Sequence, residues 1–285
     1  FATSIMSRAQ IANAGAVLGV VADRSGAVVA GAPVTARNIN TGFTKEAQTD
    51  STGGFEILGL PIGAYTVNVS MQGFKTWSVK NLVLEIGQQS RLSPVLDIGS
   101  SSEQVNVQAD SEQLQTENAS VDTVVQQKQI RDLPLNGRNA VQLVSLAPGM
   151  QYTGQAGGQF GAERGSTVQG IGIQSGQTQF TLDGFNSNGN MDEGAVAIPS
   201  VDAIAEFSVK ASGFSAEYGR DALQVLMVTK AGTNSFHGSA WEFTRNSAFG
   251  AANHFATTKP RLVQNQFGAA GGCPIFRNRT FFFAS

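Results

Sequence analysis

The sequence Tyr65-Thr66-Val67-Asn68-Val69-Ser70 alternates between apolar and polar residues. Successive side chains of a β-strand point to opposite faces, so the alternation predicts a strand whose Tyr65, Val67 and Val69 lie on a buried face. Outward from this stretch, similar short runs recur between turn residues. They are residues 17–22, 33–38, 43–49, 55–58, 82–86 and 92–96. Short strands at this spacing predict a β-sandwich over residues 15–97.

The composition agrees with β architecture and excludes several classes of protein. Of the 285 residues, 33 are glycine and 14% are charged, whereas about 25% are charged in a typical soluble chain. The net charge is −2 and the sequence has no cluster of lysine or arginine, so we expect no nucleic-acid partner. A single cysteine, Cys273, excludes an intrachain disulfide and a multi-cysteine metal site.

The first unit resembles a known domain. Gly19-Val20-Val21-Ala22-Asp23, Leu60-Pro61-Ile62-Gly63 and Gly73-Phe74 are similar to the carboxypeptidase regulatory-like domain. The resemblance implies a seven-stranded sandwich of the carbohydrate-binding-like fold. It does not imply peptidase activity, because H-E-x-x-H is absent and two histidines, His237 and His254, cannot supply three zinc ligands. We expect an accessory domain, and no enzyme, metal site or cofactor.

Residues 98–232 are predicted to form an α+β unit after a hinge at 99–102. Val121, Val124 and Val125 have helix-like offsets within residues 118–129. Residues 140–146 predict a second helix, which ends before Ala147-Pro148-Gly149, and residues 180–185 predict a strand and a turn.

Several motifs of this unit occur in the same order and spacing as in a known family of domains. They are Leu133-Pro134-Leu135-Asn136-Gly137-Arg138-Asn139, Leu146-Ala147-Pro148-Gly149, Leu182-Asp183-Gly184, Ile198-Pro199-Ser200-Val201-Asp202-Ala203-Ile204-Ala205-Glu206-Phe207 and Ala216-Glu217-Tyr218-Gly219-Arg220. The succession resembles the plug domain of TonB-dependent outer-membrane receptors, most closely the Oar-like branch, in which a sandwich precedes the plug. Leu223 and Gln224 stand where the family usually has paired glycines before the closing strand.

The two ends of the chain complete the expected organisation. Ser7-Arg8-Ala9 leads us to expect a tail or signal remnant at 1–14. Residues 234–246 alternate like a barrel strand, with 263–268 and 279–284 as the next two, and residues 271–276 resemble a glycine-rich turn of an Oar-like barrel. A membrane barrel needs about 8 or more strands, and residues 233–285 supply about three to five, so we expect an incomplete transmembrane β-barrel.

One segment suits pairing with a protein partner. The resemblance places a TonB box near the start of the plug, where an extended segment pairs with the sheet of an energy-transducing inner-membrane protein. The candidate residues are Glu103, Gln104, Val105, Asn106, Val107, Gln108 and Ala109. The alternating valines fit equally well the first strand of the plug itself.

Two further sets of residues are candidates for solute and barrel contacts. An apical, ligand-facing loop is expected at Asp183, Asn186, Asn188, Asn190 and Asp192. Lumen or plug–barrel contacts are expected at Arg138, Arg164 and Arg220, for which solvated arginines are the alternative.

The resemblance implies a function at the outer membrane, with the residues described here in the periplasm and barrel lumen. A plug gates the energised uptake of a bulky solute, such as a carbohydrate, a peptide or a metal chelate. Its partners are a TonB-type protein and, through the barrel, outer-membrane lipid. The glycine-rich residues 154–176 hold few apolar groups, so we expect them to open first. The alternative function is a surface adhesin or assembly protein whose sandwich binds carbohydrate.

Overall fold

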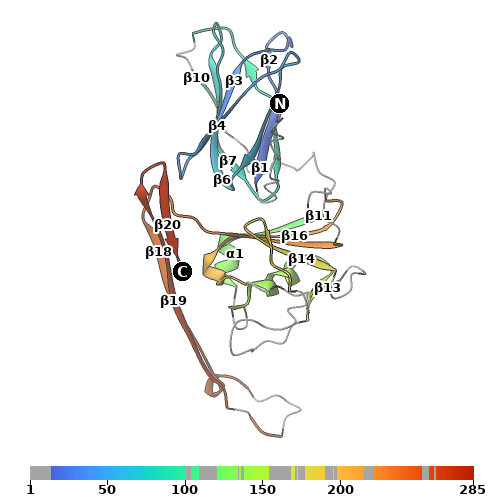
Figure 1. Cartoon of the computed structure of the whole chain (residues 1–285), viewed down its shortest axis with the longest axis vertical. Coiled ribbons are helices and arrows are strands. Elements are labelled where there is room, and N and C mark those ends of the chain that lie inside the picture. The colour runs from blue at the N-terminus through green and yellow to red at the C-terminus, as the bar shows by residue number, and fades with distance from the viewer. Residues whose placement is uncertain are drawn as a thin grey trace, which may run out of the picture. The chain divides into compact units, whose positions relative to one another are not determined.

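The computed structural model describes most of the chain. The described residues are 14–100, 104–108, 121–133, 135, 138–153, 168–170, 172, 177–189, 195, 198–214, 218, 221–251, 257–259 and 261–285. They divide into two compact units, one ending at Lys230 and one running from Ala231 to Ser285. Most elements of both units are strands, which confirms the predicted mainly-β fold (Figure 1). Within these ranges no helix is both long enough and apolar enough to cross a membrane.

A β-sandwich opens the first unit. One sheet has the order β5-β1-β8, a second has the order β10-β7-β6-β3-β4, and β2 pairs with β9. The strands are β1 (Gly15–Val20), β2 (Ala22–Asp23), β3 (Pro33–Asn38), β4 (Thr44–Gln48), β5 (Gly54–Leu60), β6 (Gly63–Val69), β7 (Thr76–Leu84), β8 (Gln89–Leu92), β9 (Val95–Leu96) and β10 (Gln104–Gln108).

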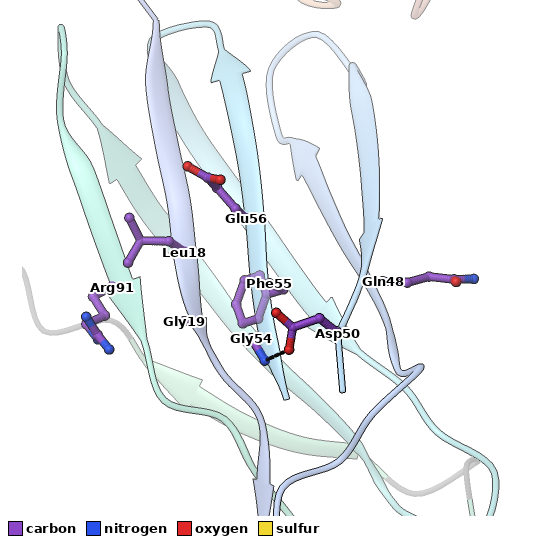
Figure 2. A pocket seen from close by; sticks show the side chains of 8 residues that line it. All are labelled: Leu18, Gly19, Gln48, Asp50, Gly54, Phe55, Glu56 and Arg91. Carbon is purple, nitrogen blue, oxygen red and sulfur yellow. Dashed lines mark hydrogen bonds between the residues drawn. The ribbon is translucent and has the colours of Figure 1, made fainter. Parts of the chain in front are cut away.

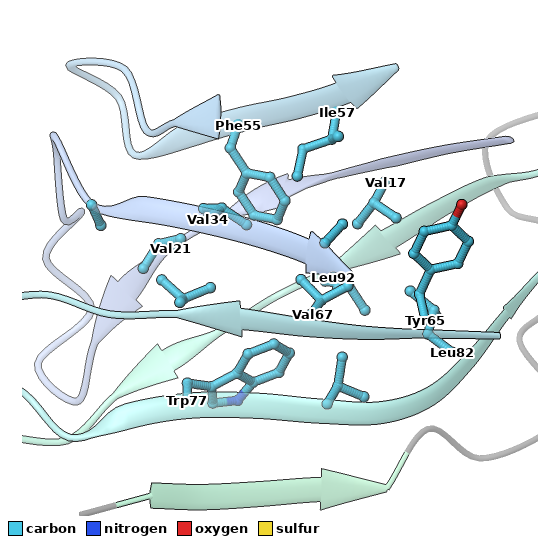
Figure 3. Packing of buried hydrophobic residues seen from close by; sticks show 14 of the residues in the cluster. Val17, Val21, Val34, Phe55, Ile57, Tyr65, Val67, Trp77, Leu82 and Leu92 are labelled. Carbon is cyan, nitrogen blue, oxygen red and sulfur yellow. The ribbon is translucent and has the colours of Figure 1, made fainter. Parts of the chain in front are cut away.

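The core of the sandwich follows the alternation in β6. Tyr65, Val67 and Val69 are all 0% exposed, as the sequence predicts. Figure 3 shows their neighbours, Phe55 of one sheet and Trp77 of the other, directed into the same apolar cluster. The hydroxyl of Tyr65 donates to the carbonyl oxygen of Pro61 at 2.7 Å, so its polar atom has a partner although the ring is buried.

The part of the chain that resembles a plug domain, called the plug below, follows with a mixed five-stranded sheet in the order β11-β16-β17-β14-β15 and a separate pair, β12-β13. Helix α1 and the 3-10 helices η2 and η3 connect the strands. The elements are β11 (Val121–Gln126), α1 (Gln127–Asp132), η2 (Ala140–Leu146), β12 (Met150–Tyr152), β13 (Val168–Gly170), β14 (Thr178–Leu182), β15 (Phe185–Asn186), η3 (Val201–Ala203), β16 (Ile204–Ser212) and β17 (Leu223–Thr229).

The helix expected within residues 118–129 is wrong for Val121–Gln126, which form β11. β11 pairs antiparallel with β16, and Val125 is 1% exposed within the plug core. Pairing with a distant strand therefore overrides the local spacing of the valines. The helix expected at residues 140–146 is present as η2, capped by Asn139, whose side chain accepts from the N–H of Val141 at 2.9 Å.

The second unit is an antiparallel meander of β18 (His237–Asn246), β19 (Val263–Phe276) and β20 (Thr280–Ala284), with η5 (Ser247–Phe249) after β18. The glycine-rich turn expected at residues 271–276 is wrong, because these residues belong to β19 and the turn follows at residues 277–279. Position 272 inside this strand has little room for a side chain, because a Cβ there would lie 2.8 Å from the ring of His237. At Gly272 the glycine therefore reflects close packing within a strand and not a turn.

Candidate functional site

The candidate partner-binding segment is a strand of the sandwich. Gln104–Gln108 form β10, which pairs parallel with β7, Gln104 opposite Thr76 and Gln108 opposite Lys80. The plug sheet instead takes β11 as the first of its strands in chain order. The segment is extended, as both sequence interpretations require, but it lies in the sandwich sheet, beyond the expected limit at residue 97. Glu103 and Ala109 lie outside the described residues.

The expected hinge at residues 99–102 begins with a residue that is tied to the sandwich. The N–H of Gly99 donates to the carbonyl oxygen of Gly73 at 3.1 Å, and Ile98 forms a β-bridge with Phe74. The chain is therefore still part of the sandwich at Gly99, and β10 begins at Gln104.

The candidate ligand-facing loop begins at the β14–β15 hairpin. Asp183 and Gly184 form its turn with φ of 48° and 86°. The carboxylate of Asp183 accepts from both the N–H of Thr229, at 2.8 Å, and its hydroxyl, at 2.7 Å. Asp183 therefore fixes the last residue of β17.

The asparagines of this loop also bind the plug backbone. Asn186 accepts from the N–H of Asn188 at 2.8 Å. Asn188 accepts from the N–H of Phe180 and donates to the carbonyl oxygen of Thr178, both at 2.7 Å. These residues organise the base of the loop, whereas Asn190 and Asp192 lie outside the described residues.

Of the three candidate arginines, the structure describes Arg138 alone. Its guanidinium forms an ion pair with Asp202 of η3, and the two side chains are 12% and 5% exposed. The pair joins the Leu133–Asn139 and Ile198–Phe207 motifs inside the plug. Arg164, Arg220 and most of the glycine-rich residues 154–176 lie outside the described ranges.

A contact between sandwich and plug was not predicted. The turn after β7 places Ile86 against the plug sheet, where its N–H donates to Oε1 of Glu206 at 2.7 Å. The Ile86 side chain is 1% exposed and packs with Tyr218 and Leu226. We call this set of residues, Ile86, Glu206, Tyr218 and Leu226, the junction.

Glycine at position 87 makes the junction possible. Gly87 has a φ of +63°, which L side chains rarely adopt, and a Cβ there would lie 2.2 Å from the hydroxyl of Tyr218. The turn therefore needs a residue without a side chain both for its backbone and for its approach to the plug.

Burial changes the acid–base chemistry of the junction. Glu206 is 7% exposed, and this burial raises its pKa to about 7. The charge of Glu85 acts in the same direction, while the Ile86 N–H and the charge of Lys210 oppose the rise in pKa. The carboxyl group of Glu206 therefore changes charge near neutral pH while it accepts the hydrogen bond from the sandwich.

A buried ion pair involves β16, the strand that also carries Glu206. Lys210 of β16 donates to Asp122 of β11 at 2.5 Å, and the two side chains are 2% and 8% exposed. The ammonium group also lies 5.0 Å from the centre of the Tyr218 ring, a cation–π geometry. The plug sheet thus buries two charged groups of β16, Glu206 and Lys210, next to the sandwich turn. The sequence signals were the two family motifs that contain Glu206 and Tyr218, residues 198–207 and 216–220.

The sandwich also carries an open groove of about 350 Å³ (Figure 2). Its lining residues are Leu18, Gly19, Gln48, Asp50, Gly54, Phe55, Glu56 and Arg91. Asp50 is engaged in its own turn, where it accepts from the N–H groups of Thr52 and Gly54 at 2.8 and 2.9 Å. Phe55, the aromatic residue of the lining, is 6% exposed and belongs to the core. The groove therefore offers charged and amide groups but no exposed ring on which a sugar could stack.

Three family models match consecutive parts of the chain. Residues 16–97 match the carboxypeptidase regulatory-like domain, residues 113–225 match the TonB-dependent receptor plug domain, and residues 228–285 match an outer membrane beta barrel domain. The matches agree with the sequence resemblance in identity and in order. No curated protein matches the chain.

Solved structures give partial likenesses. The siderophore receptor PirA from Acinetobacter baumannii is 20% identical with a TM-score of 0.40, over 55% of this chain and 23% of that chain. A putative carbohydrate binding protein from Bacteroides uniformis is 18% identical with a TM-score of 0.26, over 30% of this chain and 41% of that one. The TIE protein of Bacillus anthracis is 20% identical with a TM-score of 0.26, over 30% and 17%. This chain spans less than half the length of each.

Proposed function

Because the plug and barrel domains identify this chain as part of a TonB-dependent receptor of the outer membrane, we propose that its plug gates the energised uptake of a bulky solute. The carrying observation is the domain order, in which the plug match ends at residue 225 and the barrel match begins at residue 228. A plug joined directly to a barrel is suited to closing that barrel. The role is transport and not catalysis.

The partner is a TonB-type inner-membrane protein that pairs with the segment Glu103–Ala109. An extended segment with a free edge offers backbone hydrogen bonds to a partner's sheet. The position of β10, the last sandwich strand in the chain before the plug begins, supports this assignment. The candidate solutes are a carbohydrate, a peptide or a metal chelate, bound on the outer side of the plug near Asn190 and Asp192.

The test is solute uptake by cells that carry the full-length gene with Val105→Pro. Proline lacks the N–H that strand pairing needs, so uptake should fall to the level of cells without the receptor. Gln72→Pro is the matched control. Gln72 is exposed and precedes Gly73, whose φ is +87°, in a turn closed by the Phe74 N–H and the Met71 carbonyl oxygen. Proline is favoured at that turn position.

The control variant should transport like the wild type at equal surface abundance. Unchanged uptake with Val105→Pro would remove the partner assignment. Uptake that continues after the proton gradient is collapsed would contradict energised transport itself.

A further inference from the structure

We propose that the sandwich presents β10 as an unguarded sheet edge, to which a strand of the energy-transducing partner pairs while β10 stays bound to β7. The inference rests on the proposed function and specifies where its partner docks. The docking surface is then the outer strand of a folded domain and not a free tail.

The two edges of the five-stranded sheet differ in a way that favours this docking. At the far edge, β4 reads Thr44-Lys45-Glu46-Ala47-Gln48, and its Lys45 and Glu46 are exposed. Charged residues on an edge strand discourage pairing with another chain. At the opposite edge of the same sheet, β10 reads Gln104-Val105-Asn106-Val107-Gln108, a sequence without a charged residue or a proline. One edge of the sheet is therefore protected and the other is not.

The hydrogen bonding of β10 leaves room for a second neighbour. The N–H and C=O groups of successive residues in a strand point to opposite edges, so pairing with β7 uses one edge of β10. No other strand among the described residues pairs with β10. A partner strand can use the remaining edge without displacing β7.

Holding the segment extended also favours binding. A free segment would lose conformational freedom when it paired with a partner, whereas β10 has already lost it by joining the sandwich. The sheet order extends to partner-β10-β7-β6-β3-β4, with the new strand added at the unprotected edge.

This arrangement gives the pull of the partner a route to the plug. β10 pairs with Thr76–Lys80 of β7, and β7 continues to Leu84. Two residues later, Ile86 contacts Glu206 of the plug sheet. A load on β10 therefore passes through β7 to the junction.

The test locks β10 to β7 with a disulfide. Asn106 and Ser78 are opposite each other in the parallel register. The Cα separation of neighbouring strands, about 4.8 Å, is within the range that a disulfide accepts. Ser78→Cys with Asn106→Cys is made in the whole chain with Cys273→Ser, since Cys273 is the only native cysteine. The probe is the periplasmic domain of a TonB-type protein, and its Kd is measured with the disulfide formed and reduced. Each single-cysteine variant is a control for the substitutions.

The expected result is a Kd that changes less than twofold on oxidation, with binding slowing hydrogen exchange in residues 104–108 of the locked form. A Kd raised tenfold or more by oxidation and restored by reductant would overturn the inference, because β10 would then have to leave the sandwich. That outcome would leave the proposed partner intact. Absence of binding by both forms and by the wild type would overturn the inference and also contradict the proposed partner.

Discussion

The N–H of Ile86 donates to Oε1 of Glu206 across 120 positions of sequence, at 2.7 Å. This bond joins the turn after β7 to strand β16, and so joins the sandwich to the plug. Beside it, Ile86 packs with Tyr218 and Leu226. Burial of Glu206 raises the pKa of its carboxyl group to about 7. The first three predictions below follow from this region and its neighbours.

The junction should weaken as pH rises from about 5 to 8. The folded pKa of Glu206, about 7, lies above its ordinary value of 4.5, so the contribution of this group to folding is fully present below pH 4.5 and is lost as pH rises through 7. The loss is on the order of a few kcal/mol. Glu206→Gln is neutral at every pH and can still accept from Ile86. It should therefore flatten the pH dependence of the melting temperature and be the more stable form above pH 7.

Glu56→Gln controls for the removal of a glutamate, because Glu56 is exposed on β5. It should keep the wild-type dependence of melting temperature on pH. If Glu206→Gln keeps that dependence too, Glu206 does not titrate in this range.

Ile86→Ala should separate the sandwich from the plug. Ile86 is 1% exposed at the junction, and removing a buried isoleucine side chain costs about 2 to 5 kcal/mol of stability. We expect faster hydrogen exchange at Glu206 and its neighbours in β16, with the sandwich core unaffected. Ile98→Ala makes the same change at a residue that is 84% exposed, so it should alter neither the stability of the protein nor hydrogen exchange in β16. Slow exchange in β16 of Ile86→Ala would contradict the coupling.

Lys210→Ala should destabilise the plug because it leaves the carboxylate of Asp122 buried without its cation. Removing one partner of a buried ion pair costs about 3 to 5 kcal/mol, measured by chemical denaturation. Replacing both groups, as Lys210→Met with Asp122→Leu, should recover most of this loss. Arg131→Ala breaks the exposed pair with Asp132, whose side chains are 58% and 52% exposed, and should cost less than about 1 kcal/mol. A cost as small for Lys210→Ala would mean that the plug pair is not buried in solution.

The loop after β15 should separate into structural and solute-binding residues. Asn188→Ala removes side-chain bonds to Phe180 and Thr178, so it should lower the melting temperature of the plug. Asn190→Ala with Asp192→Ala should leave the melting temperature unchanged and reduce solute uptake. A double variant with normal uptake at normal surface abundance would exclude these two residues from solute binding.

Much of the sandwich could be predicted because burial on one face leaves a simple pattern. Tyr65, Val67 and Val69 alternate with polar residues and are all buried. The pattern fails where a distant segment decides the structure. Val121, Val124 and Val125 have the spacing of a helix, but pairing with β16 makes this segment a strand.

The same reasoning explains why the junction was missed. Along β16, Glu206, Ser208 and Lys210 alternate with Phe207 and Val209, a pattern that predicts an exposed polar face. All three polar residues are nevertheless buried. Glu206 contacts a turn that lies 120 residues earlier, and Lys210 pairs with Asp122 of β11. No local pattern records neighbours so far away in sequence.

The two bonds from Thr229 to Asp183 have a further consequence. Thr229 is the final residue of β17, and Lys230 is the last residue of the first unit. One carboxylate at the tip of the β14–β15 hairpin therefore anchors the point where the chain departs from the plug toward the barrel strands. A displacement of the hairpin tip must either move Thr229 with it or break these two hydrogen bonds. A solute that displaced the tip would therefore also shift the segment of chain that leads to the barrel strands.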